Sequence, residues 1–283
     1  MATAAVTRDG AIRVAEFRPA DDDHALAAAL AGAVDDHGLR RCSAVGVLAG
    51  GDYQIQQLQA PEVPAEELPQ ALRWRLRDVI SEPLEQVVSD VIPIPAGSTR
   101  RGPPMVYAVA AQRERTEHLA GAIADSGLHV AALDIPELAI RNLAARVEPQ
   151  GGGVAVLAVG EQDGLLTISR EGALYLVRAL DLGATHLRAD PDQVAGRLAL
   201  EVQRSLDYYD SQLYGAPPRS ILVLPTAEVD SADLAARMAS ELGVDVAPMD
   251  VAALLPDSEP LSDGQQRRVA LAVGAALRGV DGG

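Results

Sequence analysis

Few side chains in this sequence have the types and spacing that catalysis or metal binding requires. The five histidines are scattered at positions 24, 37, 118, 129 and 186, and none pairs with another at helical spacing. Arginine supplies all 24 basic residues, so no lysine is present for a Walker-A loop, a Schiff base or a kinase-type Lys–Glu pair. The serines form no nucleophile elbow, and the glycines form no dinucleotide fingerprint. The sequence therefore predicts neither a hydrolase site nor a metal site.

Trp74, the only tryptophan, is the residue whose type best suits binding. It is flanked by Arg73 and Arg77, and tryptophan and arginine are both enriched at protein interfaces. The apolar stripe of the same expected helix lies about 160–200° away from Trp74. This stripe consists of Leu68, Leu72, Leu76 and Val79. Two interpretations follow: Trp74 contacts a partner together with the two arginines, or it forms a second buried face under a neighbouring subdomain.

The composition indicates a globular and strongly acidic chain. Of 283 residues, 48% are apolar and 3% aromatic, so we expect cores of small aliphatic side chains. A net charge of −16 disfavours contact with nucleic acid or anionic lipid. Cys42, the only cysteine, excludes an intramolecular disulfide, and its apolar run at 42–49 predicts a buried thiol. The N-terminus has no signal pattern and no run approaches the ~20 apolar residues of a membrane span, which favours a cytoplasmic location.

The elements that position these residues follow from periodicity and from turn residues. In the first half we expect strands at 11–17, 42–49, 53–58, 87–94, 105–111 and 129–133. Helices are expected at 21–38, 68–79 and 113–125, with another beginning at Pro136. The Pro and Gly residues of 148–153 then cannot continue a regular element, so we place a domain boundary there.

Beyond this boundary the pattern of strands followed by helices begins again. A three-strand meander is expected at 154–159, 165–169 and 174–180, and a long helix with Asp190 as N-cap and Pro191 at its first position follows. Further elements are a strand at 221–224, a helix at 231–242, a strand at 244–246 and a helix at 265–277. The sequence thus predicts two related α/β domains, 1–148 and 149–283, with an inserted subdomain at about 52–130 in the first.

Four stretches resemble the PilM/MshI family of pilus assembly proteins, and the MSHA-pilus (MshI-like) branch more closely. They are Ala60–Pro95, Asp134–Leu143, Leu200–Tyr209 and Ala270–Arg278, and they occur in the family's order. The resemblance implies an actin-like ATPase (ribonuclease H-like) fold, in which two related α/β domains flank a nucleotide cleft. This expectation agrees with the duplication that the pattern of elements indicates.

The resemblance also indicates where a nucleotide site would lie. Such a site needs two glycine-containing hairpin turns that hold phosphates through backbone N–H groups, carboxylates near Mg²⁺, and usually a Gly-Gly pair beside the adenosine. At the first turn Gly10 is present, but Thr7 replaces the expected Asp. At the second turn Gly160 and Gly164 remain, but Ala158 replaces the Asp. Pro225 lies where the Gly-Gly pair would be.

These replacements predict a degenerate site, and therefore a pseudo-ATPase without a bound cofactor. Each lost carboxylate or phosphate-binding turn would remove several kcal/mol of transition-state stabilisation, on the order of magnitude seen at other sites. Asp9 and Asp163 are still present in the two turns, where Asp commonly serves only to form the hairpin. The alternative is a working ATP/Mg-dependent switch.

The family's partners complete the expectation. The resemblance implies a cytoplasmic scaffold that lies at the inner membrane through a single-pass partner similar to PilN. It would link that partner to the pilus assembly ATPase complex, without nucleic acid and without inserting into the membrane itself. The Trp74 helix and its neighbouring strands would form the walls of the partner site. A GspL-like cytoplasmic domain of a type II secretion system is a further alternative.

Overall fold

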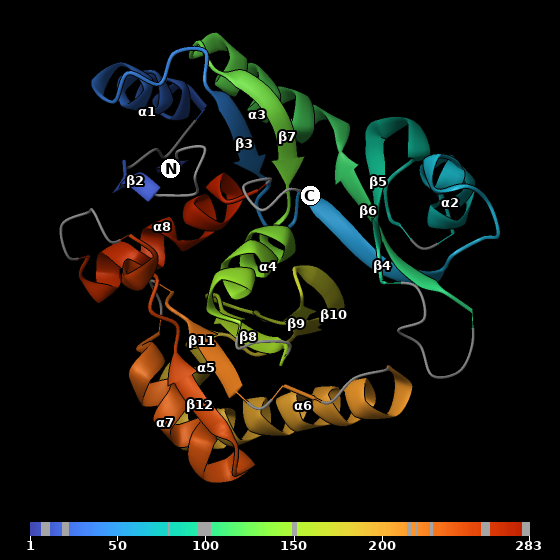
Figure 1. Cartoon of the computed structure of the whole chain (residues 1–283), viewed down its shortest axis with the longest axis vertical. Helices are drawn as coiled ribbons and strands as arrows, with labels where there is room; N and C mark the ends of the chain where they lie inside the picture. Colours follow the sequence, from blue (N-terminus) through green and yellow to red (C-terminus); the bar gives the residue numbers. More distant parts are fainter. Residues whose placement is uncertain are drawn as a thin grey trace. The chain divides into compact units, whose positions relative to one another are not determined.

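The computed structural model describes ten stretches of the chain (Figure 1). They are residues 1–6, 12–18, 23–78, 80–95, 103–148, 152–213, 217–218, 220–226, 229–255 and 261–278. The chain divides into two compact units, each described by itself below. Unit 1 consists of Met1–Arg18 and Glu137–Gly283, and unit 2 of Pro19–Pro136.

A mixed five-stranded sheet forms the centre of unit 1. Its strands are β8 (Val154–Val159), β9 (Gly164–Arg170), β10 (Ala173–Leu180), β11 (Ser220–Leu224) and β12 (Asp245–Pro248), in the order β10-β9-β8-β11-β12. The first three strands form an antiparallel meander, whereas β11 runs parallel to both β8 and β12. The meander expected from the sequence is confirmed, because short turns between β-rich runs leave few other ways to pair.

Helices cover both faces of this sheet, since alternate strand residues point to opposite faces. On one face, α6 (Pro191–Gln212) and α7 (Ser231–Leu242) pack against residues such as Leu157 and Ile168. On the other face, α4 (Pro136–Val147) and α8 (Asp263–Ala276) pack against Val154 and Val156. Figure 1 shows the strands lying between these two pairs of helices.

The long helix α6 begins and packs as its sequence predicts. The Asp190 carboxylate accepts a hydrogen bond from the Gln193 backbone N–H at 3.1 Å, and Pro191 is the first helical residue. The expected apolar spine is buried throughout: Val194, Leu198, Val202, Leu206, Tyr209 and Leu213. Before it lies α5 (Ala184–Ala189), a short helix that the sequence did not indicate.

A hairpin and a short 3₁₀ turn complete the described part of unit 1. Strands β1 (Ala2–Val6) and β2 (Ile12–Phe17) pair antiparallel with each other and lie against α8. A 3₁₀ turn at Ala252–Leu254 follows β12. The hairpin expected near the N-terminus is therefore present, but Thr7 and Gly10 of its turn lie outside the described residues.

Unit 2 contains two small sheets. Strands β3 (Ser43–Val47) and β7 (His129–Asp134) pair in parallel, and β4 (Tyr53–Gln59), β6 (Met105–Gln112) and β5 (Val87–Pro93) form an antiparallel sheet in that order. The helices are α1 (Asp23–Asp36), α2 (Leu68–Leu76) and α3 (Arg113–Asp125), and 3₁₀ turns lie at Ala65–Glu67 and Leu84–Gln86. Leu76 of α2 packs with Ala108 and Ala110 of β6, so α2 covers one face of the three-stranded sheet.

One feature differs from the sequence expectations. Cys42 is exposed rather than buried, because it lies in the turn ahead of β3, where its N–H bonds to the Leu39 carbonyl. The two compact units meet between Pro136 and Glu137, in the first turn of α4. The reason is that Leu143 of α4 packs into the core of unit 1. The two related halves, 1–148 and 149–283, stay a prediction.

Candidate functional site

The turn between β8 and β9 is the second of the two turns at which a nucleotide site is expected. The Gly160 N–H donates to the Asp163 carbonyl at 2.9 Å and closes the turn. The start of α5 lies directly against it, since the Ala184 N–H donates to the Gly160 carbonyl at 2.8 Å and the Thr185 N–H to the Glu161 carbonyl at 3.0 Å. The two backbone segments thus hold each other in place.

Glycines allow this close approach. A Cβ atom at Gly183 would lie 2.4 Å from the Gln162 carbonyl carbon and 2.6 Å from the Asp163 nitrogen. A Cβ atom at Gly164 would lie 3.1 Å from the Leu182 carbonyl oxygen. The backbone of the loop before α5 therefore fills the space beside the turn. A larger residue at Gly183 would push this loop away from the turn.

The side chain of Glu161 joins the same contact. Its carboxylate accepts a hydrogen bond from the Thr185 hydroxyl at 2.9 Å and pairs with the Arg188 guanidinium. The Thr185 hydrogen bond, and after it the Arg188 hydrogen bond, hold the pKa of Glu161 below its usual value. Two groups that recognise anions, a hydroxyl and a guanidinium, are thus bound to a carboxylate of the chain itself.

Ala158 and Pro225 lie next to this turn, at the carboxyl ends of two parallel strands. Ala158 of β8 is in register with Leu224 of β11, and both contribute to the apolar cluster under α4 and α8. Pro225, which follows Leu224, is buried. Open sheets usually bind ligands at these strand ends. Here Ala158 presents a methyl group where the resemblance implies an Asp, and Pro225 lies where it implies a Gly-Gly pair.

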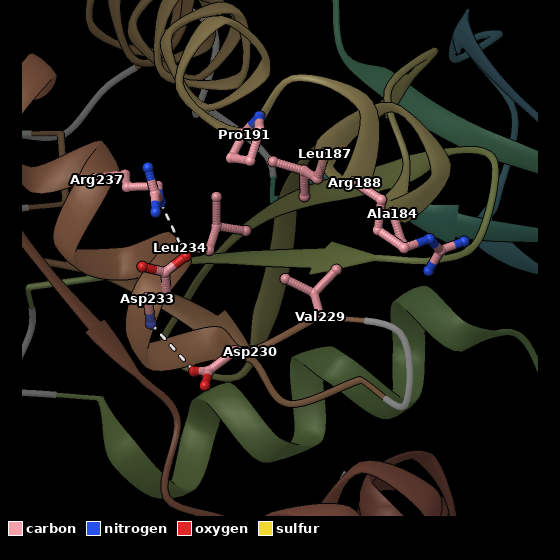
Figure 2. Close-up of a pocket in the computed structure, with 9 residues that line it drawn as sticks. All are labelled: Ala184, Leu187, Arg188, Pro191, Val229, Asp230, Asp233, Leu234 and Arg237. Atoms are coloured by element: carbon pink, nitrogen blue, oxygen red, sulfur yellow. Dashed lines mark hydrogen bonds and ion pairs between the residues drawn. The ribbon is translucent and has the colours of Figure 1, made fainter.

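A hollow of about 200 Å³ lies beside the turn, between α5, the start of α6 and the start of α7 (Figure 2). Five apolar residues form its floor: Ala184, Leu187, Pro191, Val229 and Leu234. Figure 2 shows Arg188 at one end of the hollow and Arg237, Asp233 and Asp230 at the other.

The charged groups of the hollow are paired within the chain. Arg237 donates to the Asp233 carboxylate at 2.8 Å and also pairs with Asp192. The Asp230 carboxylate caps α7 by accepting from the Ala232 and Asp233 N–H groups at 2.9 and 3.1 Å. The hydrogen bond from Arg237 holds the pKa of Asp233 below its usual value.

These residues do not fit a magnesium triphosphate. Glu161, Asp192, Asp230 and Asp233 outnumber Arg188 and Arg237, so the local charge would repel an anionic ligand. The start of α7, another anion-binding feature, is already occupied by Asp230. Among the described residues, no group of three or more His, Cys, Asp or Glu side chains is placed to hold a metal ion.

Trp74 lies in unit 2, remote in sequence from this turn, and its side chain is 65% exposed. The interpretation of a second buried face is therefore wrong. The Arg77 guanidinium lies 5.7 Å from the Trp74 ring centroid, within the range of a cation–π contact, and 3.5 Å from the Asp78 carboxylate. Arg73 has a different contact, because it donates to the Leu84 carbonyl at 2.9 Å and holds α2 to the following turn.

Sequence reasoning missed α5 and with it the hollow. The segment 184–189 is too short for helical periodicity to be recognised, and its contacts with the β8–β9 turn are tertiary. The only local signal was Gly183, which precedes the helix and approaches another backbone. Among the described residues, no helix combines the length and the hydropathy that crossing a membrane would require.

Comparison with known proteins gives the fold. No family model and no curated protein sequence matches the chain. A solved structure described as the PilM-PilN type IV pilus biogenesis complex matches with a TM-score of 0.73 and 23% identity, over 99% of this chain and 94% of that chain. A protein of Bacteroides thetaiotaomicron with an actin-like ATPase fold matches with a TM-score of 0.50 and 10% identity, over 91% and 95% of the two chains.

A third structure, the cytoplasmic domain of EpsL from the type II secretion system of Vibrio cholerae, matches with a TM-score of 0.49 and 16% identity. It covers 89% of this chain and 84% of that chain. The first two matches show that the chain has an actin-like ATPase fold of the PilM-like kind, and the fold expected from the sequence is confirmed.

Proposed function

We propose that this protein is a non-catalytic cytoplasmic scaffold of a type IV pilus assembly machine. The observation that carries the proposal is the match to the PilM-PilN complex, which extends over almost the whole of both chains. Coverage of that length includes residues of both units and is not limited to one common domain. The four stretches that resemble the PilM/MshI family support an MSHA-type machine.

The pseudo-ATPase part of the proposal is supported by the second turn. Ala158 and Pro225 are apolar, and Glu161 binds the hydroxyl and guanidinium that an external phosphate would use. A shared fold does not by itself imply a shared activity, so these contacts and not the fold support the proposal of a degenerate nucleotide site.

The partner is a single-pass inner-membrane protein similar to PilN, which would hold this chain at the cytoplasmic side of the membrane. We place its contact on the Trp74 helix, where an exposed tryptophan and Arg77 form an amphipathic surface. Arg73 holds α2 in position through its hydrogen bond to the Leu84 carbonyl and so helps to position this surface. A second contact would connect the scaffold to the pilus assembly ATPase complex.

Binding of cytoplasmic peptides tests this function. Synthetic N-terminal cytoplasmic segments of single-pass pilus proteins are titrated against the full chain and against Trp74→Ala by fluorescence anisotropy. We expect one segment to bind the full chain, and its dissociation constant to rise at least about tenfold in the variant, since an interface tryptophan contributes ~2 kcal/mol or more. Leu200→Ala is the control, because Leu200 is also a large exposed apolar residue and lies on α6. Equal binding by wild type and Trp74→Ala contradicts the assignment.

A working ATP-dependent switch of the same fold, in a pilus or type II secretion platform, is the competing function. One observation favours it: the Thr226 hydroxyl oxygen, beside Pro225, is buried without a hydrogen-bond partner among the described residues. Thermal melting with and without Mg-ATP separates the two functions. A ligand at about 100 times its dissociation constant stabilises by about 2.7 kcal/mol, which is several degrees. The scaffold predicts no shift, and a shift of that size would establish the switch.

A further inference from the structure

The hollow between α5 and α7 has the size and lining of a pocket for one side chain. Its volume of about 200 Å³ is below the roughly 300–1,000 Å³ of small-molecule sites. Its apolar lining includes Leu187, Val229 and Leu234, and Figure 2 shows the charged side chains at the two ends of this apolar group. Such a hollow can take up one aliphatic or aromatic side chain of a partner peptide, while the backbone of that peptide lies on the surface of this protein.

The rim determines which charge that partner carries. Asp192 and Asp233 share the guanidinium of Arg237, and Arg188 at the other end of the hollow is paired with Glu161, so one negative charge remains after pairing. Asp192 is exposed over 88% of its side chain, which leaves it open to a second cation. Asp230 adds a further carboxylate, bound only to neutral N–H groups of α7. Basic residues would therefore gain from this rim, and acidic ones would be repelled.

We infer that the hollow is a docking site for a basic peptide segment that inserts one large apolar side chain between α5 and α7. This inference rests on the proposed function, because the cytoplasmic segments of single-pass membrane proteins are rich in Lys and Arg near the membrane. The occupant is thus the basic part of such a segment, and the site lies in unit 1, separate in the chain from Trp74.

The charge of the whole chain agrees with this occupant. At −16, the protein attracts a basic segment at long range and accelerates its association at low salt. The same charge disfavours an acidic peptide, a nucleotide or an anionic membrane surface at this position.

The test uses a fluorescein-labelled ten-residue peptide with a central Phe and four Lys residues around it, titrated against the full chain by anisotropy. Two control peptides carry Glu in place of Lys, or Ser in place of the central Phe. We expect the first peptide to bind, the Ser peptide to bind at least about tenfold more weakly because one apolar side chain is lost, and the Glu peptide not to bind.

Protein variants locate the binding. Val229→Trp fills the hollow and should abolish binding, whereas Val88→Trp, at an exposed valine of β5, should not. The double variant Asp192→Asn with Asp233→Asn should weaken binding about three- to tenfold at low salt and less at high salt. Asp207→Asn with Asp210→Asn removes the same charge near the other end of α6 and serves as the matched control.

Absence of binding by the basic peptide, equal binding by the Val229→Trp variant, or equal binding of the Glu peptide would each overturn the assignment. Competition by Mg-ATP would assign the hollow to a nucleotide instead. The results for the hollow and for the proposed function can be told apart. If Val229→Trp no longer binds the basic peptide but still binds a pilus segment through Trp74, both contacts are supported. Trp74-dependent binding without any effect of Val229→Trp would remove the hollow alone.

Discussion

Gly183 shows how one missing side chain positions the candidate site. Its α-carbon approaches the β8–β9 turn so closely that even a methyl group would overlap the backbone of Gln162 and Asp163. Backbone atoms held by hydrogen bonds cannot move away as the end of a flexible side chain can. At Gly196, in the middle of α6, a methyl group would meet no atom within 4 Å.

We therefore expect opposite effects of the same substitution at these two glycines. Gly183→Ala should lower the free energy of unfolding by about 1–3 kcal/mol through overpacking. Gly196→Ala should raise it by up to about 1 kcal/mol, because alanine favours the helix and restricts the unfolded chain. Urea unfolding followed by circular dichroism measures both. A Gly183→Ala protein as stable as the wild type would show that the turn and the α5 loop are not in direct contact.

Tyr209 gives a prediction on pH. Burial in the core of unit 1 raises the pKa of its phenol, and the nearby Arg170 guanidinium opposes that rise only in part. An acid with a higher pKa in the folded chain keeps its proton more firmly there than in the unfolded chain. Unfolding therefore becomes easier as the pH rises above the ordinary phenol value of about 10.

Tyr209→Phe should reduce this loss of stability at alkaline pH. The variant keeps the ring packing and removes the ionising group, so its melting temperature should fall less steeply above pH 10 than that of the wild type. Tyr208→Phe is the control, because the neighbouring Tyr208 side chain is 38% exposed. Identical pH profiles for wild type and Tyr209→Phe would mean that another group causes the alkaline loss.

At the scale of elements, the helices of unit 1 are fixed by short local signals. Asp230 begins α7 by capping two N–H groups, and Gly243 ends it in a left-handed conformation with φ of +64°. An Asp at the N-cap and a glycine in the left-handed conformation after the last turn favour the beginning and the end of a helix at these positions. The carboxylate that caps α7 also lies at the rim of the hollow, so the local signal and the candidate site share one residue.

Replacing this cap should separate its two roles. Asp230→Ala removes the carboxylate oxygen that accepts both hydrogen bonds and should cost about 1 kcal/mol of stability, whereas Asp230→Ser keeps a capping oxygen and should cost much less. Thermal unfolding of the two variants measures the difference. Equal stability of the two would indicate that the start of α7 is held by its packing and not by its cap.

At the scale of the whole molecule, the chain forms two compact units with separate cores. Unit 2 buries Leu76, Val87 and Ala108 between α2 and the three-stranded sheet, without help from residues after Pro136. A unit that has its own hydrophobic core and consists of one continuous stretch of chain can fold alone. Unit 1, in contrast, is built from two distant stretches of sequence, because the β1–β2 hairpin lies against α8.

Residues 19–136 expressed alone should therefore fold. We expect this fragment to unfold in urea in one cooperative transition. The Leu76→Ala variant should unfold at a lower urea concentration, because truncating the fully buried Leu76 removes about 2–5 kcal/mol from the free energy of unfolding. The exposed Trp74→Ala variant in the same fragment should unfold close to wild type, because truncating an exposed side chain leaves no cavity. A fragment without a cooperative transition would mean that unit 2 needs the rest of the chain.

Most of the elements follow from local patterns in the sequence. The meander β8–β10, the Asp190 cap of α6 and the extent of α7 agree with the ranges expected from alternation, helical periodicity and turn residues, which act over a few residues. The resemblance to pilus proteins led to the actin-like fold, which the structural matches confirm. Local patterns are sufficient to predict these elements, because each sequence signal acts within the element that contains it.

Where these elements meet depends on the folded chain as a whole. The exposure of Trp74, the exposure of Cys42 and the packing of α4 into unit 1 depend on which surfaces of the folded chain come together. The contact of Glu161 with Thr185 and Arg188 joins a turn to a helix some 24 residues away. The spacing of residues in the sequence does not indicate such contacts, because they form only when the strands and helices of unit 1 pack together.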